Sequence, residues 1–170
     1  YKKKGVNCIK KTVCLIGRPN VGKSTIFNRL IKEKKSIILD TPGITRDRIY
    51  GNVTHKNKTF HLIDTGGIDV GDDAFNEEIL VQASVAIDEA DVVVFVVDGK
   101  EELDQNDFVI RDMLMKSGKK VIVAVNKIDN EKRKNDIYSF YELGFDTYIP
   151  ISSIHNTGFV ELMDTITMNF

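Results

Sequence analysis

Short, wholly apolar runs alternate along the chain with segments whose apolar residues recur every three or four positions. The runs have the length and composition of buried strands, whereas the recurring positions are typical of amphipathic helices. Strands are therefore expected at residues 12–16, 92–97, 120–125 and 147–151, with an antiparallel hairpin formed by 48–55 and 58–64. Helices are expected from Ser24, from Phe75 to about Ala90, and at residues 108–116, 132–143 and 157–170.

The alternation of strand and helix predicts an α/β fold of three layers, with a mainly parallel sheet of about six strands, one antiparallel edge strand and helices on both faces. Residues 34–47 show no sustained period and contain Pro42 and Gly43, so we expect a loop there. Residues 12–170 are predicted to form a single domain. Residues 1–11 carry five lysines and are interpreted as a basic leader outside the fold.

The composition says more about the binding partners that can be expected than about the fold. The 170 residues are 42% hydrophobic and 29% charged, which is enough apolar material for one core. With 24 basic and 25 acidic residues the net charge is -1, so we expect no strong nucleic-acid binding by this domain. No apolar run approaches the roughly 20 residues of a membrane span. The two cysteines, Cys8 and Cys14, indicate no disulfide framework, and a reducing cytoplasmic or organellar compartment is expected.

The segment between the first strand and the first helix has the phosphate-loop pattern G-x-x-x-x-G-K-[ST]. Its glycines let the backbone approach phosphates, whose charge the helix N-terminus favours. Lys23 is expected to place positive charge at the β- and γ-phosphates, and Ser24 to place its hydroxyl on Mg²⁺. The residues expected to bind the phosphates are Gly17, Pro19, Asn20, Val21, Gly22, Lys23, Ser24 and Thr25.

A second pattern, N-K-I-D at residues 126–129, directly follows the apolar strand at 120–125 and predicts which base is bound. The carboxylate of Asp129 can accept hydrogen bonds from guanine N1–H and from the 2-amino group, and adenine does not offer this pair of donors. Lys127 is expected to cover the base, and Asn126 to tie this loop to the phosphate loop. The two patterns together predict GTP or GDP as the ligand, whereas a P-loop kinase would leave Asp129 unexplained.

Two further segments are predicted to sense the γ-phosphate. Asp64 is expected to hold a Mg²⁺-bound water, the Gly67 N–H to meet the γ-phosphate, and Thr45 to add its hydroxyl to the metal. These contacts require a triphosphate, so the segments are interpreted as switches. Ile68 follows Gly67 where Ras-like GTPases place a glutamine that orients the attacking water. Hydrolysis is therefore expected to be slow unless another group assists.

Together these segments resemble the Der/EngA family of ribosome-assembly GTPases, specifically the first of that family's two tandem G domains. The resemblance rests on GRPNVGKST with FNRL, DTPGITRDRIYG, LIDTGGI, EADVVVFVVDG, NKID, FYELGF and PISSIHNTG. It implies a Ras-like P-loop NTPase fold and hydrolysis of GTP, with Lys23, Thr45, Gly67 and Asn20 taking part in catalysis. Era-like and tRNA-modifying GTPases share several of these patterns and form the alternative, as does a module that binds GTP or GDP with negligible hydrolysis.

The resemblance also implies further ligands and partners. Ser152, Ser153 and Ile154 would form the loop that contacts guanine, with Ser153 standing where the family usually has alanine. The side-chain carbonyl of Asn20 would hold K⁺ beside the phosphates. The complete protein would carry a second G domain and a KH-like domain, and it would assist assembly of the large ribosomal subunit.

Overall fold

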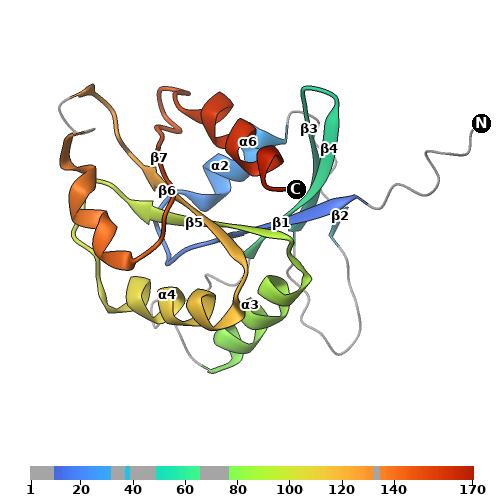
Figure 1. Cartoon of the computed structure of the whole chain (residues 1–170), viewed down its shortest axis with the longest axis horizontal. Coiled ribbons are helices and arrows are strands. Elements are labelled where there is room, and N and C mark those ends of the chain that lie inside the picture. The colour runs from blue at the N-terminus through green and yellow to red at the C-terminus, as the bar shows by residue number, and fades with distance from the viewer. Residues whose placement is uncertain (1–9, 32–36, 39–48, 66–76, 132–134) are drawn as a thin grey trace, which may run out of the picture.

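The computed structural model describes residues 10–31, 37–38, 49–65, 77–131 and 135–170. These residues form one sheet with helices on both faces (Figure 1). In chain order the elements are β1 (Lys11–Ile16), α2 (Lys23–Leu30), β2 (Ile37–Ile38), β3 (Ile49–His55), β4 (Lys58–Asp64), α3 (Glu77–Glu89), β5 (Val92–Asp98), α4 (Gln105–Ser117), β6 (Lys120–Asn126), the 3₁₀ helix η2 (Asn135–Leu143), β7 (Tyr148–Pro150) and α6 (Phe159–Met168).

The sheet has seven strands in the order β2-β3-β4-β1-β5-β6-β7. The strands from β4 to β7 run parallel to one another, while β3 runs antiparallel to its two neighbours. This confirms the predicted mainly parallel sheet. The strand beyond the six expected is β2, a two-residue strand within the segment predicted as loop, where Ile37 and Ile38 pair with Tyr50 and Ile49 of β3. Two consecutive β-branched residues favour a short edge strand, although the sequence around them shows no longer strand pattern.

Two hydrophobic cores fill the spaces between the sheet and its helices. Helices α2 and α6 cover one face, and α3 and α4 cover the other (Figure 1). Because successive strand residues point to opposite faces, Val13 of β1 packs in the core with α2 and α6, whereas Cys14 packs in the core with α3 and α4. All seven residues of β5 are buried, and each fully buried valine contributes roughly 1.5–3 kcal/mol. The central strands are thus held from both sides.

Several boundaries differ slightly from those expected. Strand β1 begins at Lys11, which was assigned to the basic leader. The helix expected at 132–143 is the 3₁₀ helix η2, and the closing helix begins at Phe159, after Gly158 turns the chain with a φ of 84°. Residues 1–9, 32–36, 39–48, 66–76 and 132–134 lie outside the described residues, so the predictions for Thr45, Gly67 and Ile68 fall there.

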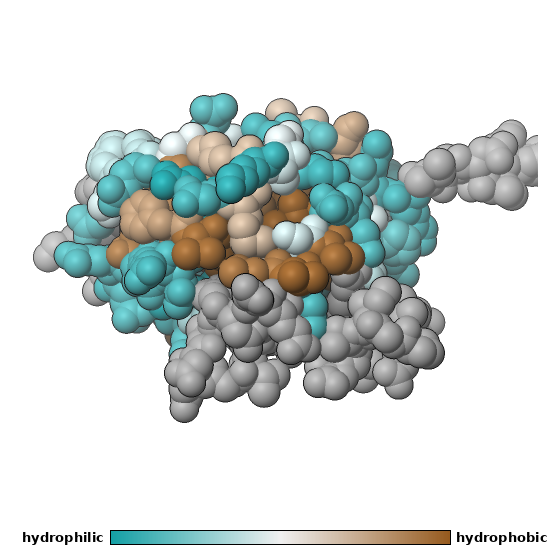
Figure 2. Space-filling model, turned by 90° about the horizontal axis from the view of Figure 1, so that it is seen from below, coloured by the Kyte–Doolittle hydropathy of each residue, from teal (hydrophilic) through white to brown (hydrophobic). Residues whose placement is uncertain are grey.

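The face covered by α3 and α4 carries a band of hydrophobic surface bordered by hydrophilic residues (Figure 2). The exposed apolar side chains on these helices are Val81 and Val85 of α3 and Met115 of α4. Within the described ranges, no helix is both long and apolar enough to cross a bilayer.

Candidate nucleotide-binding site

The predicted site residues gather at one edge of the sheet, where the parallel strands β1, β5, β6 and β7 end. The phosphate loop follows β1, Asp98 ends β5, the segment from Asn126 to Asp129 follows β6, and Ser152 follows β7. Ligands of open α/β sheets bind outside the carboxyl ends of the strands. The parallel sheet therefore brings together loops that lie far apart in the sequence.

The phosphate loop is pressed against the neighbouring strand. A Cβ atom added to Gly17 would lie 2.6 Å from the carbonyl oxygen of Val96 in β5, which leaves no room for a side chain. Gly22 adopts a φ of 100°, a left-handed conformation that favours glycine. Gly22 is also the N-cap of α2, so no side chain takes the N–H groups of the first helical turn. Those groups are placed to receive an anion.

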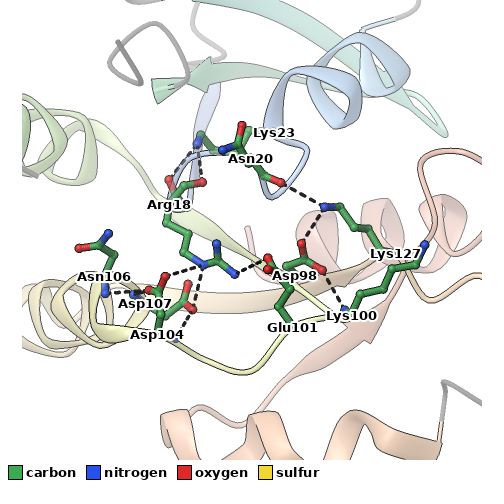
Figure 3. A network of polar contacts seen from close by, with 11 residues as sticks. Arg18, Asn20, Lys23, Asp98, Lys100, Glu101, Asp104, Asn106, Asp107 and Lys127 are labelled. Atoms are coloured by element: carbon green, nitrogen blue, oxygen red, sulfur yellow. Dashed lines mark hydrogen bonds and ion pairs between the residues drawn. The ribbon is translucent and has the colours of Figure 1, made fainter. Parts of the chain in front are cut away.

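Lys23 lies buried inside the phosphate loop. The residue is 3% exposed, and its ammonium nitrogen donates to the carbonyl oxygens of Gly17 at 2.8 Å and Arg18 at 3.2 Å (Figure 3). The next two residues of α2, Ser24 and Thr25, are exposed in its first turn. The loop thus presents a lysine charge and a serine hydroxyl side by side, as the phosphate-loop pattern predicts.

Arg18, another residue of this loop, was missed by the sequence analysis. Its guanidinium is buried, and it donates to Asp107 of α4 at 3.1 Å and to Glu101 at 3.3 Å (Figure 3). Burial acts to lower the pKa of Arg18, but the charges of Asp107 and Asp104 outweigh it and the pKa is raised. Burial raises the pKa of Asp107 itself. Arg18 therefore ties the phosphate loop to the start of α4.

Asn126 joins the phosphate loop to the loop that follows β7. Its side-chain amide donates to the Val21 carbonyl at 2.9 Å, and its side-chain oxygen accepts from the Ser153 N–H at 3.2 Å. Asn126 is 1% exposed, so both hydrogen bonds are shielded from water. This confirms the expected tie to the phosphate loop and extends it to a third segment.

Lys127 makes a second connection to the phosphate loop. Its ammonium donates to the Asn20 carbonyl at 3.1 Å and to the Asp98 carboxylate at 2.7 Å (Figure 3). Burial acts to raise the pKa of Asp98, but hydrogen bonds from Lys127 and from the Lys100 N–H outweigh it and hold the pKa below its ordinary value. The sequence analysis missed Asp98. Its position at the end of an apolar strand, beside the strand that carries the N-K-I-D pattern, was the available signal.

Asp129 has a partner on each carboxylate oxygen. The hydroxyl of Ser152 donates to one oxygen at 2.7 Å, and the ammonium of Lys100 lies 2.9 Å from the other. Hydrogen bonds from Lys100 and then Ser152 hold the pKa of Asp129 below its ordinary value. Ser152 is fully buried, whereas Ile154 is 69% exposed. The predicted base-binding residues are thus adjacent, and Lys100 was not among them.

The oxygen donors predicted for Mg²⁺ are hard ligands of the kind that this ion prefers. Asp64 ends β4 opposite Leu15 of β1 and is 2% exposed, and Ser24 lies in the first turn of α2. A hydroxyl that binds the ion and a carboxylate that holds one of its waters fit an ion whose other ligands are phosphate oxygens and water. Thr45, the third predicted ligand, lies outside the described residues, so the full donor set stays a prediction.

Comparison with known proteins identifies the family. Residues 12–127 match the family model described as 50S ribosome-binding GTPase. The chain is 52% identical over 161 residues to GTPase Der of Staphylococcus saprophyticus and 50% identical to GTPase Der of Staphylococcus aureus strain Newman. Each match covers 95% of this chain and 37% of the relative. The chain therefore spans just over a third of the length of these curated relatives.

Solved structures agree with this assignment. Era of Aquifex aeolicus, determined with GDP·AlF4⁻ bound, has a TM-score of 0.77 at 29% identity, over 95% of this chain and 57% of that one. The G domain of the T. maritima FeoB iron transporter has a TM-score of 0.73 at 29% identity, over 95% of this chain and 99% of that one. These matches confirm the predicted Ras-like P-loop fold, and the chain belongs to the family of 50S ribosome-binding GTPases, in which it matches the Der proteins.

Proposed function

We propose that this domain binds guanine nucleotides and hydrolyses GTP to GDP and phosphate. The observation that carries the proposal is the double hydrogen bond of Asn126, which joins the phosphate loop to the loop that places Ser152 beside Asp129. One buried amide thus sets the spacing between a phosphate site and a carboxylate suited to guanine. The names of the Der relatives, all called GTPases, support the reaction.

At the phosphate end, the chain supplies positioning and charge. The N–H groups of the phosphate loop and the first turn of α2 receive phosphate oxygens, and Lys23 turns its ammonium from the carbonyls of Gly17 and Arg18 to the β- and γ-phosphates. Ser24 and Asp64 are the described residues that would hold Mg²⁺, which when bound neutralises charge on the phosphates. In-line attack by water then depends mainly on how well these groups are held.

At the base end, Asp129 selects guanine. A carboxylate offers about four acceptor positions, and Ser152 and Lys100 occupy two of them. The remaining positions can accept guanine N1–H and the 2-amino group. Lys127 is anchored through Asp98 and the Asn20 carbonyl, and its aliphatic stem would cover the base. Adenine would leave the carboxylate without its partners, which penalises ATP.

Replacing Asp129 with asparagine tests the assignment. Each hydrogen bond to the charged carboxylate is worth about 1.5–3 kcal/mol, so Asp129→Asn should weaken GDP binding by at least tenfold. Xanthine carries an oxygen where guanine has its 2-amino group, and the new amide can donate to it, so xanthosine diphosphate should bind the variant better than the wild type does. Calorimetric titration of both nucleotides measures the change.

The matched control is Asp112→Asn, an aspartate that is exposed on α4 and pairs with Arg111. Its GDP affinity should equal that of the wild type. Unchanged GDP affinity in Asp129→Asn would rule out the assignment of the base site, and a wild-type domain that bound ATP as tightly as GTP would rule out guanine selectivity altogether.

Two finer proposals extend this function. We propose that Asn20 holds K⁺ beside the phosphates, which would compensate for Ile68 standing in place of a glutamine. We also propose that the domain is the first of two G domains in a longer protein that also carries a KH-like domain and assists large-subunit assembly. The family description and the 37% coverage of the Der relatives support the second proposal.

A further inference from the structure

We propose that Lys100 is a positioning residue of the base site, which orients the Asp129 carboxylate and thereby sets the preference for guanine over a purine that lacks the 2-amino group. The inference rests on the proposed function, in which Asp129 receives guanine. It concerns a residue outside the phosphate-loop and N-K-I-D patterns.

The backbone on both sides of Lys100 is fixed against the base loop. The Gly99 N–H donates to the Asn126 carbonyl at 2.7 Å, and a Cβ added to Gly99 would lie 2.6 Å from that oxygen and 2.6 Å from the Ile128 side chain. The Lys100 N–H donates to Asp98 at 2.8 Å. The two loops are therefore packed backbone to backbone, and the origin of the Lys100 side chain is set by close contacts.

The side chain of Lys100 holds one oxygen of Asp129 while Ser152 holds the other. The ammonium lies 2.9 Å from one carboxylate oxygen, and the serine hydroxyl lies 2.7 Å from the second. A carboxylate bonded at both oxygens from two different loops loses its freedom to rotate about the Cβ–Cγ bond. Guanine needs both oxygens in one plane, because its two donors are parallel, whereas hypoxanthine presents only the N1–H.

Lys100 also completes a chain of polar contacts from the phosphate loop to the base site. The Asn20 carbonyl accepts from Lys127, Lys127 pairs with Asp98, Asp98 accepts from the Lys100 N–H, and Lys100 pairs with Asp129. Figure 3 shows Lys127 and Lys100 bonded to the same Asp98 carboxylate. These contacts connect the Asp129 carboxylate to the phosphate loop, so the orientation of the carboxylate depends on the position of that loop.

The ion pair between Lys100 and Asp129 is partly exposed, which favours a role in orienting Asp129 over a role in stabilising the fold. The Lys100 side chain is 43% exposed and that of Asp129 is 17% exposed, and pairs of this kind add little to the free energy of unfolding. Hydrogen bonds from Lys100 and Ser152 lower the pKa of Asp129, and the ordinary pKa of an aspartate is already about 3.9. Asp129 is therefore ionised at neutral pH with or without Lys100, and a test at pH 7.5 reports on orientation.

The test compares the affinities of GDP and inosine diphosphate, measured by calorimetry on the same protein. Lys100→Met keeps most of the aliphatic stem and removes the charge, and it should weaken GDP binding by about threefold to fivefold, the size that a partly exposed pair supports. Inosine diphosphate should lose less affinity than GDP does, so the ratio of the GDP affinity to the inosine diphosphate affinity should fall. Lys100→Arg should restore the ratio, because the guanidinium can pair with the same oxygen.

Lys56→Met is the matched control, because Lys56 forms an ion pair of 3.0 Å with Asp164 that does not involve the site residues. Its affinities should equal those of the wild type. An unchanged ratio in Lys100→Met would overturn the inference, as would tighter GDP binding, which would show that Lys100 competes with the base. A wild-type domain that bound neither nucleotide would instead contradict the proposed function.

Discussion

Buried charges with partners in other loops determine the geometry of the site at the scale of single residues. Asp98 is 3% exposed and pairs with Lys127, and Asp107 is 1% exposed and pairs with Arg18. Removing one member of such a pair leaves the other desolvated and uncompensated, which costs more than the net worth of the pair. The contacts of these two aspartates therefore contribute both to the free energy of unfolding and to the conformation of the phosphate loop.

The lowered pKa of Asp98 leads to a pH-dependent prediction. A carboxyl with a folded-state pKa below its unfolded value, about 3.9, contributes stability above that value and loses it as pH falls through the folded pKa. Asp98→Asn should lower the free energy of unfolding by about 1–3 kcal/mol at pH 7, and the difference from wild type should shrink below about pH 4. Urea unfolding across this range measures it, with Asp112→Asn as the exposed control. A difference that stays constant with pH would show that the Asp98 charge is not the cause.

The phosphate loop shows how backbone conformation constrains the sequence at the scale of an element. Asn20 and Gly22 both have positive φ, at 71° and 100°, within a loop that joins β1 to α2. Asparagine is one of the few residues that tolerate a left-handed conformation, so the backbone alone gives a reason for Asn20. The proposed cation role needs a variant that keeps the conformation and removes the side-chain carbonyl.

Asn20→Gly meets that need, because glycine adopts positive φ without strain. If the side-chain carbonyl holds K⁺, the wild type should hydrolyse GTP faster in K⁺ than in Na⁺ at equal ionic strength, and the variant should lose the difference while keeping its GDP affinity. A cation that neutralises charge between the β- and γ-phosphates does the work of an arginine finger, which is worth on the order of 10³ to 10⁵ in rate. Single-turnover phosphate release measures both proteins. Equal wild-type rates in the two salts would refute the cation role.

At the scale of the whole molecule, the net charge bears on which partners this chain can attract. The net charge is -1, so the chain as a whole has no excess positive charge with which to attract nucleic-acid phosphates. Loops from four parallel strands still form the nucleotide site within this chain, because the two cores hold those strands from both faces.

Co-sedimentation compares ribosome binding by this domain with ribosome binding by a longer Der protein. At physiological salt this chain should stay in the supernatant when isolated large ribosomal subunits are pelleted, because its net charge of -1 gives it no overall attraction to rRNA phosphates. A longer Der protein should pellet with the subunits, and its binding should differ between GDP and a non-hydrolysable GTP analogue. Pelleting of this chain by itself would show that the domain carries a ribosome-binding surface of its own.

The sequence by itself predicted the mainly parallel sheet and placed its helices and strands to within a few residues. Burial periodicity is local, and the short, wholly apolar run of β5 is typical of a strand that is covered on both faces. The motif residues could be read because their chemistry depends on short, fixed spacing. The Asn126 tie to the phosphate loop was predicted on the same basis, and its hydrogen bond to the Val21 carbonyl confirms it, whereas the bond from the Ser153 N–H was not predicted.

Only the tertiary structure decided which charges meet around those motifs. Arg18 lies 89 positions from Asp107 and Lys127 lies 29 positions from Asp98, and nothing in either local pattern names the partner. Lys100 stands in a loop without a recognisable motif, and it reaches Asp129 because β5 and β6 end side by side. Pairing of this kind depends on strand order and register, which are settled by the packing of the whole sheet and cannot be read from a window of sequence.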